Sequence, residues 1–431
     1  MTVPTGVAVL VLDMSYTLRM FRERQLDQAL ESRRTGGFFA HVISVHPLAA
    51  LFETGRARYG APVVTWIDES HAFIEGKLGR FHWPSVLGPL NFLLAQWDVM
   101  RLSMTLGRRL DVAVVRIGDP YYLGIMGWML SKVLRVPLAV RVPFRYDDIR
   151  RLTGRAVMPR LFRWPWVEKR IERFVFRRCD LIAGANDDNM RYALENGGRP
   201  AIATVFRYGN LLHASHWMEP DQRPDPTPDL KDLGLAEGPF VATVARLEPM
   251  KRVEDAIRAV GEIRRRGVAI RALIVGDGTL QAPLEALARS HDLGDAIVFA
   301  GARNQEWIAR VLPRAAVILS PHMGRALTEA ALSAVPIVAF DYDWQREVVV
   351  DGETGFLVPN GDWEAMADRA VQLLEDPARA RAMGRAVRIK VAAMMHPASL
   401  VRHEQETYRR LLDGWTRNPA ERCAPPQSVP R

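Results

Sequence analysis

Short apolar runs alternate with amphipathic stretches along most of the chain, and this alternation restricts the fold more than any other feature. The run VAVLVLD (7–13) is continuously apolar, as expected for a strand buried on both faces of a sheet. The stretch 18–32 follows with helical spacing, and Gly36-Gly37 ends it. Further apolar runs stand at 38–45, 62–67, 111–117, 137–142, 180–185, 240–247, 270–278, 296–301, 315–320 and 336–340. In the second half, helical spacing fills 251–266, 280–290, 304–313 and 325–334. This rhythm predicts an α/β protein built from doubly wound parallel sheets.

The length of 431 residues suggests two domains, because one hydrophobic core rarely serves so long a chain. Pro220, Pro224, Pro226 and Pro228 interrupt the rhythm, and clustered prolines disfavour both helix and central strand. We therefore predict two domains, each with its own doubly wound parallel sheet. The predicted parts are a first domain (1–215), a linker (216–230), a second domain (231–395), a C-terminal helix (396–417) for which we allow a return to the first domain, and a disordered tail (418–431).

The cysteines and the termini favour a cytoplasmic protein. Cys179 and Cys423 have neither metal-ligand nor redox spacing, so a disulfide framework is not expected and a reducing compartment is the default. The first fifteen residues lack a basic region and are interpreted as a first strand and not as a signal peptide. The apolar segment 121–140 is interrupted by Lys132 and Pro137, which favours a buried helix and strand over a membrane span.

The charge is divided unevenly between the two halves. Residues 1–215 carry 30 basic and 19 acidic side chains, whereas residues 216–431 carry 28 and 30. The segment 141–178 holds 12 basic and 4 acidic residues, interleaved with Phe144, Trp164 and other aromatic and leucine side chains. Such a segment suits binding to an anionic membrane surface, and the inner face of the plasma membrane is the expected location. A solvated helix with a buried apolar stripe is the alternative interpretation. No zinc-finger, recognition-helix or RNP-type pattern indicates nucleic acid.

Two cations follow the strand at 240–247. Arg246 stands near the strand end and Lys251 near the start of the next helix, where the helix dipole disfavours a positive charge. Ligands of open parallel sheets lie outside the carboxyl ends of the strands, and an arginine fork with a lysine point charge suits a pyrophosphate. We therefore predict a phosphate site at Arg246 and Lys251, and prefer it to a pair of solvated side chains.

Two further constellations follow later strands. Gly276 and Gly278 in LIVGDGTL allow a tight turn and a close approach of backbone to a ligand, although a lone Gly-x-Gly is weak evidence. Glu329 lies on the predicted helix 325–334; its carboxylate could accept hydrogen bonds from a ribose diol, and the helix N-terminus could stabilise a diphosphate. A solvated helical glutamate is the simpler alternative.

The stretch 316–358, together with the Arg246–Lys251 segment, resembles the donor-binding half of the retaining glycosyltransferases of family 4 (glycosyl transferases group 1), which have the GT-B fold. The family's "GRL…KG" element has Ala245 and Arg252 in place of its glycines here. Of the family's two glutamates separated by seven residues, Glu329 matches the second, and Pro321 replaces the first.

The resemblance implies that two Rossmann-like domains face each other across a cleft. It also implies that the first domain lies on the acceptor side and that the second binds a nucleotide-sugar. Arg246, Lys251 and Glu329 would be catalytic. Because Pro321 replaces a carboxylate, His322, Arg325 and backbone N–H groups of 323–325 are candidates to contact the sugar instead. The implied donor-binding residues are Gly276, Gly278, Arg303, His322, Met323, Gly324, Arg325, Leu327 and Thr328.

The first half offers three acceptor-side candidates. Arg116 and Asp119 in RIGDPYY follow a predicted strand, and Arg19 lies near the loop after the first strand. A structural salt bridge explains Arg19 and Arg116 equally well.

The resemblance implies no cofactor, since the nucleotide-sugar is a substrate, and we expect no metal. The Asp-x-Asp at 341–343 is interpreted as a loop with solvated acids.

The function implied by the resemblance is transfer of a hexose-type sugar, with retention of anomeric configuration, to a glycan or lipid-linked acceptor in envelope polysaccharide or glycolipid synthesis. The departing nucleoside diphosphate would be stabilised by Arg246 and Lys251. The main alternative is a non-catalytic nucleotide-sugar or glycan-binding subunit, which the loss of the first glutamate favours. A GT-B epimerase would need further carboxylates that we cannot place.

Overall fold

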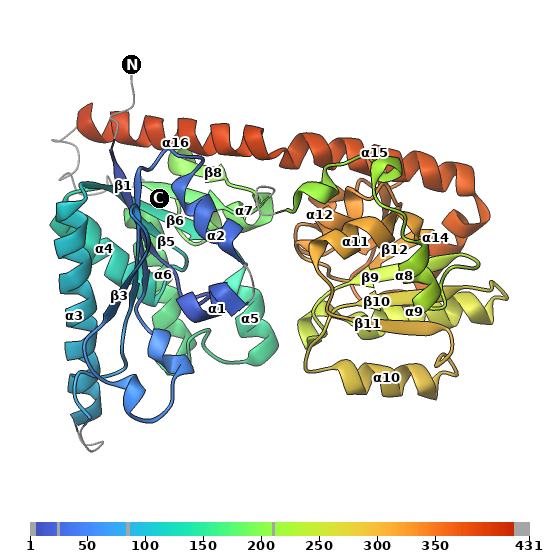
Figure 1. The fold of residues 1–431 in the computed structure, drawn as a ribbon, viewed down its shortest axis with the longest axis horizontal. Helices are drawn as coiled ribbons and strands as arrows, with labels where there is room; N and C mark the ends of the chain where they lie inside the picture. The colour runs from blue at the N-terminus through green and yellow to red at the C-terminus, as the bar shows by residue number, and fades with distance from the viewer. Residues whose placement is uncertain (1–5, 24–25, 83–86, 209–211, 418–431) are drawn as a thin grey trace, which may run out of the picture. The chain divides into compact units, whose positions relative to one another are not determined.

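The computed structural model describes residues 6–23, 26–82, 87–208 and 212–417. The chain forms two compact units, the first from Met1–Arg207 with Ala398–Arg431 and the second from Tyr208–Pro397 (Figure 1). Each unit is a parallel sheet covered by helices, so the prediction of two Rossmann-like α/β domains is confirmed. The predicted disordered tail, 418–431, lies outside the described residues.

The sheet of the first unit has eight strands in the order β3-β4-β2-β1-β5-β6-β7-β8. All neighbours are parallel except β3, which runs antiparallel to β4 at the edge. The alternation in the sequence did not reveal β4 and β8. The bounds are β1 Ala8–Leu12, β2 His41–His46, β3 Val63–Asp68, β4 His71–Glu75, β5 Val112–Ile117, β6 Leu138–Val142, β7 Leu181–Gly184 and β8 Ala203–Val205.

The helices of the first unit are α1 Leu18–Glu23, α2 Asp27–Glu31, α3 Gly88–Arg109, α4 Tyr122–Leu134, α5 Tyr146–Thr153, α6 Pro165–Arg178, α7 Asp187–Glu195 and α16 Pro397–Arg417. The single helix predicted over 18–32 is instead divided into α1 and α2. Helix α16 packs on this unit, because Tyr408 is fully buried in a core cluster with Phe38, Phe39 and Phe206.

The sheet of the second unit has six parallel strands in the order β11-β10-β9-β12-β13-β14. Its strands are β9 Phe240–Val244, β10 Arg271–Val275, β11 Ile297–Gly301, β12 Val317–Ser320, β13 Ile337–Phe340 and β14 Gly355–Val358. Its helices are α8 Thr227–Asp232, α9 Val253–Arg265, α10 Gln281–Ser290, α11 Gln305–Val311, α12 Ala326–Ala331, α13 Gln345–Val348, α14 Trp363–Glu375 and α15 Pro377–Met395.

The segment 216–230, which the prolines suggested as a linker, packs into the second unit, and the division between the units falls at Arg207/Tyr208. The buried Arg223 guanidinium donates to the carbonyls of Ala309 at 2.8 Å and Leu332 at 2.8 Å, and Leu230 is buried. Pro228 lies in the first turn of α8, where a missing N–H leaves no hydrogen bond unmade. The prolines therefore begin short helical turns here.

Among the described helices, none combines the length and the apolar character that a membrane crossing requires.

Candidate functional site

The strand order of the second unit reverses at β9. This strand pairs with β10 on one side and with β12 on the other, and the chain runs from β9 through α9 to β10 before it returns to β12. A crevice at the carboxyl ends of the strands is expected at such a switch point. The loops after β9 and β12 meet there, and they carry most of the residues singled out in the sequence.

Arg246 and Lys251 follow β9 as predicted. Arg246 is exposed, Lys251 is partly buried in the turn Pro249–Lys251, and neither forms an ion pair with another described residue. Burial, and then the charge of Arg246, lower the pKa of Lys251 to about 8, while Asp343 opposes the shift. The two adjacent positive charges repel each other. An anionic ligand bound beside them would offset this repulsion.

Gly324, in the loop after β12, lies directly against Lys251. A Cβ on Gly324 would stand 3.1 Å from the Lys251 Nζ, and φ at this glycine is +63°, which other residues rarely adopt. The structure therefore brings together two predicted residues that are 73 positions apart in sequence. The amine of Lys251 therefore faces the bare backbone of Gly324.

His322 connects three loops. Its Nδ1 lies 2.9 Å from the carbonyl oxygen of Met250, and its Nε2 lies 3.0 Å from Oδ2 of Asp343. A carbonyl oxygen only accepts, so Nδ1 carries a proton. Both ring nitrogens thus have partners within the protein. A sugar could contact this ring only by displacing Asp343 or by packing against the edge of the ring.

The Asp-x-Asp of 341–343 differs from the expected pair of solvated acids. Asp343 is held by His322, and Asp341 pairs with Arg346 at 2.8 Å. The sequence could not indicate the first contact, because it depends on β12 and β13 being neighbours. Within the described ranges no group of three or more His, Cys, Asp or Glu side chains could hold a metal ion.

Gly276 and Gly278 allow two loops to touch. A Cβ on Gly276 would stand 1.8 Å from the carbonyl oxygen of Ala245, and one on Gly278 would stand 2.4 Å from that of Leu247. The Leu247 N–H donates to the carbonyl of Asp277 at 2.8 Å. The glycines therefore fix the loop that carries Arg246, and contact with a ligand remains a prediction for both.

Glu329 is not the solvated residue of the simpler alternative. It is 5% exposed, and no described residue donates a hydrogen bond to its carboxylate. Burial raises the pKa of Glu329, and the positive charge of Arg325 opposes the shift. A carboxylate in this mostly buried position is costly to ionise, and hydrogen bonds from a ligand hydroxyl would lower that cost.

The predicted helix 325–334 spans only the six residues of α12. Its dipole is correspondingly short, so diphosphate stabilisation would come mainly from the two cations after β9. Met323, Leu327 and Thr328 are buried, which leaves backbone groups as their route to a ligand. Arg303 is exposed after β11, with its guanidinium 5.1 Å from the centroid of the Trp307 ring.

The first unit carries a different polar group at the carboxyl ends of its strands. Asp13 follows β1, and the buried Arg33 donates to its Oδ2 at 2.7 Å. Burial lowers the pKa of the Arg33 guanidinium, and the charge of Asp13 opposes that shift. The nearby Arg116, on β5, is 7% exposed. Sequence analysis missed Asp13, although its place directly after an apolar strand was a usable signal.

Asp119, a predicted acceptor-side residue, lies after β5 and is also buried. Burial raises its pKa to about 7, an N–H bond from Tyr121 at 2.8 Å opposes the shift, and the negative charges of Asp13 and Glu168 add to it. Arg19 is exposed and pairs with Glu23 at 2.6 Å, which is the salt bridge that the alternative interpretation described.

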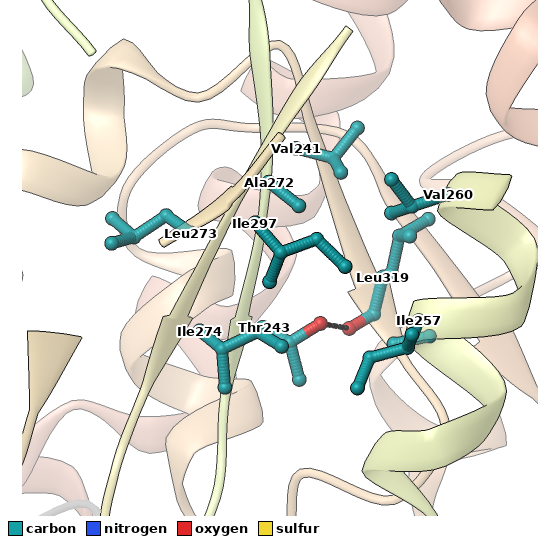
Figure 2. A pocket seen from close by; sticks show the side chains of 10 residues that line it. Val241, Thr243, Ile257, Val260, Ala272, Leu273, Ile274, Ile297 and Leu319 are labelled. Atoms are coloured by element: carbon teal, nitrogen blue, oxygen red, sulfur yellow. Dashed lines mark hydrogen bonds between the residues drawn. The ribbon is translucent and has the colours of Figure 1, made fainter. Parts of the chain in front are cut away.

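A small pocket inside the second unit is not the site. It lies among strands β9, β10 and β12 and helix α9, and it is lined almost wholly by aliphatic side chains (Figure 2). Its Thr243 hydroxyl already donates to the carbonyl of Leu319 at 2.8 Å. The pocket therefore offers nothing to an anionic or hydroxyl-rich ligand.

Comparison with known proteins gives a match over the part of the chain that carries these loops. Residues 228–390, which include the loops after β9, β10, β12 and β13, match the family model described as glycosyl transferases group 1. The matched range lies within the second unit.

Two curated relatives and one solved structure extend the comparison. The chain is 27% identical over 266 residues to an alpha-D-kanosaminyltransferase of Streptomyces kanamyceticus, covering 58% of this chain and 64% of that protein. It is 32% identical over 236 residues to a GDP-mannose-dependent alpha-(1-6)-phosphatidylinositol monomannoside mannosyltransferase of Mycolicibacterium smegmatis, covering 51% and 60%. The chain thus spans less than two thirds of either relative.

The crystal structure of Anabaena Alr3699/HepE in complex with UDP and glucose superposes with a TM-score of 0.66 at 16% identity, over 94% of this chain and 100% of that one. At this identity the match concerns the fold, and it establishes the GT-B fold for the two Rossmann-like domains. The sugar and the nucleotide are those of that protein.

Proposed function

We propose that the protein is a glycosyltransferase that moves a hexose-type sugar from a nucleotide-sugar to a glycan or lipid-linked acceptor with retention of anomeric configuration. The observation that carries the proposal is the pair Arg246 and Lys251 at the switch point of the second sheet, two cations that form no ion pair among the described residues. The family match over these loops supports it.

In the proposed reaction the bond between the anomeric carbon and the diphosphate oxygen breaks, and the acceptor oxygen bonds to the same face of that carbon. The acceptor's hydroxyl proton passes to the departing diphosphate. Negative charge grows on the leaving oxygen, and Arg246 and Lys251 stabilise it. We propose no cofactor and no metal.

Glu329 is proposed to accept hydrogen bonds from the ribose. Its burial without a described donor supports this role. In Glu329→Gln the acceptor becomes an amide, so the affinity for free nucleoside diphosphate should fall about tenfold, as expected for loss of a charge-assisted hydrogen bond. His322→Gln and Arg325→Gln should instead change the preference among donor sugars and leave that affinity nearly unchanged. Calorimetric titration of all three variants separates the roles, and parent-like binding by Glu329→Gln would remove this carboxylate from the nucleotide site.

The proposed setting is cytoplasmic synthesis of envelope polysaccharide or glycolipid, with attachment to the membrane periphery. Relatives named for amylovoran biosynthesis and for a phosphatidylinositol mannoside support it. The proposed acceptor-side residues are Arg116 and Asp119, at the carboxyl end of the central strand β5 in the first sheet.

The alternative of a non-catalytic nucleotide-sugar-binding subunit keeps one specific support, Pro321 in place of the family's first glutamate. A panel of nucleotide-sugars, with donor hydrolysis and transfer measured for each, distinguishes the two. Turnover, with NMR of the product showing the donor's anomeric configuration, supports the retaining transferase. Tight nucleotide binding without hydrolysis or transfer for any donor supports the binding subunit.

A further inference from the structure

Three helices form one layer on the sheet of the first unit. Helix α4 contacts both α3 and α6, and α3 and α4 contact strands β1, β2, β4, β5 and β6 (Figure 1). We call the solvent-facing side of this layer the α3–α4–α6 surface. Its exposed members come from segments up to 90 residues apart, so no single stretch of sequence displays it.

The solvent face of α3 is apolar over its first half and basic over its second. Leu90, Leu93 and Trp97 are 53%, 62% and 55% exposed, at a spacing that places them on one face of the helix. Arg101 and Arg108 continue the same face and are exposed. On α4 and α6 the exposed apolar side chains are Met129, Val133 and Trp166.

Acidic side chains on these three helices are few and mostly buried. The described helices α3, α4 and α6 contain three carboxylates, of which Glu168 and Glu172 are fully buried and Asp98 is held by Arg80 at 3.2 Å with 15% of its side chain exposed. The basic side chains of the same helices are exposed, except for the partly buried Lys169. By contrast, α14 in the second unit exposes Glu364, Asp368 and Glu375. Solvation alone does not require such a separation of charges.

We propose that the α3–α4–α6 surface docks the protein onto an anionic lipid bilayer. Large apolar side chains beside uncompensated arginines match the acyl boundary and the charged headgroups of such a bilayer. The apolar residues enter the interface, and the arginines contact the headgroups.

This surface differs from the basic segment 141–178 that the sequence suggested. Only α6 contributes to it from that segment. In α5 the guanidinium of Arg150 points inward and donates to Glu172 at 2.8 Å, and Asp147 pairs with Lys169. The charges of α5 are thus already neutralised within the protein.

The test is flotation of the full chain with vesicles of phosphatidylglycerol and phosphatidylcholine, compared with phosphatidylcholine alone. The parent should float with the anionic vesicles, and recovery should fall between about 0.1 M and about 1 M salt, as the Debye length shrinks from about 10 Å to about 3 Å. Leu93→Ser with Trp97→Ser should lower partitioning by about tenfold or more. Arg101→Gln with Arg108→Gln should lower it roughly 25-fold, at about fivefold for each arginine.

Matched controls lie in the second unit. Ile389, which is 71% exposed on α15, provides Ile389→Ser, and the exposed Arg381 and Arg385 provide a double glutamine variant. These controls should float like the parent, and near-parent melting temperatures should show that all variants fold.

Equal recovery with neutral and anionic vesicles, parent-like flotation of both surface variants, or equal losses in the controls would overturn the proposal. No nucleotide-sugar is needed, so the result stands apart from the proposed transferase activity.

Discussion

The two sheets present different charged groups at the carboxyl ends of their central strands: two cations in the second unit, and carboxylates mixed with the buried Arg33 and Arg116 in the first. After β9, Arg246 and Lys251 form no ion pair with any residue that the structure describes, although the charge of Asp343 acts on Lys251. After β1 and β5, Asp13 and Asp119 are carboxylates, and the arginine beside them is buried and paired. The same topology therefore serves different ligand chemistries, which the loops determine.

The cationic edge suits a diphosphate, and the carboxylate edge suits hydroxyl groups, which donate hydrogen bonds to carboxylates. This assignment agrees with a donor site in the second unit and an acceptor site in the first. It can be tested one edge at a time.

The largest effect should come from neutralising the cationic edge. Arg246→Ala and Lys251→Ala should each lower kcat by roughly 10²–10³-fold, about 3–4 kcal/mol, because each removes a donor that meets charge growing in the transition state. Steady-state kinetics measure this, and Arg258→Ala on α9, away from the strand ends, is the control. Near-parent turnover in both variants would remove the phosphate site from this edge.

A smaller effect is expected at the carboxylate edge. The pKa of Asp119 in the folded protein is about 7, above its unfolded value of 3.8, so the folded state binds the proton more tightly. Its contribution to stability is fully present below pH 3.8 and is lost as pH rises through 7.

Asp119→Asn keeps an oxygen for the Tyr121 N–H but never ionises. The variant should therefore gain on the parent by up to about 1.4 kcal/mol for each pH unit between about pH 4 and 7, and it should remain more stable at pH 8. Urea unfolding across this range gives the difference. The exposed Asp111→Asn serves as control, and a difference independent of pH would show that Asp119 is ionised throughout.

The smallest effect concerns the proton on Lys251. Its pKa of about 8 means that the free protein loses this charge as pH rises through 8. Affinity for nucleoside diphosphate should fall about tenfold from pH 7 to pH 9 in the parent. In Lys251→Arg it should be nearly flat, because arginine stays charged. A parent as flat as this variant would mean that Lys251 does not contact the diphosphate.

Sequence reasoning reached the fold because both sheets consist of apolar strands that are buried on two faces. It also placed Arg246, Lys251 and Gly324 on loops of one sheet and Glu329 on the helix after one of them, since these segments follow strands directly. It predicted too long a helix at 325–334, because the apolar run continues after α12 ends at Ala331.

What it missed depends on contacts between distant segments. Arg33 and Asp13 are 20 residues apart, and His322 and Asp343 are 21 apart, on different loops. Helical spacing and strand alternation carry no information on such pairs. The proline-rich segment 216–230 was misjudged for the same reason, because Arg223 finds its partners near residues 309 and 332.

The path of the chain has a consequence for dissection and grafting. The second unit begins at Tyr208 and ends at Pro397, so it is inserted within the sequence of the first. Stopping the chain at Arg207 would remove α16 and leave Phe38, Phe39 and Phe206 without Tyr408. Excision of Tyr208–Pro397 removes no strand of the first sheet. We therefore expect the second unit to be exchangeable between relatives as one continuous segment, and the first unit to fold only if both of its pieces are kept.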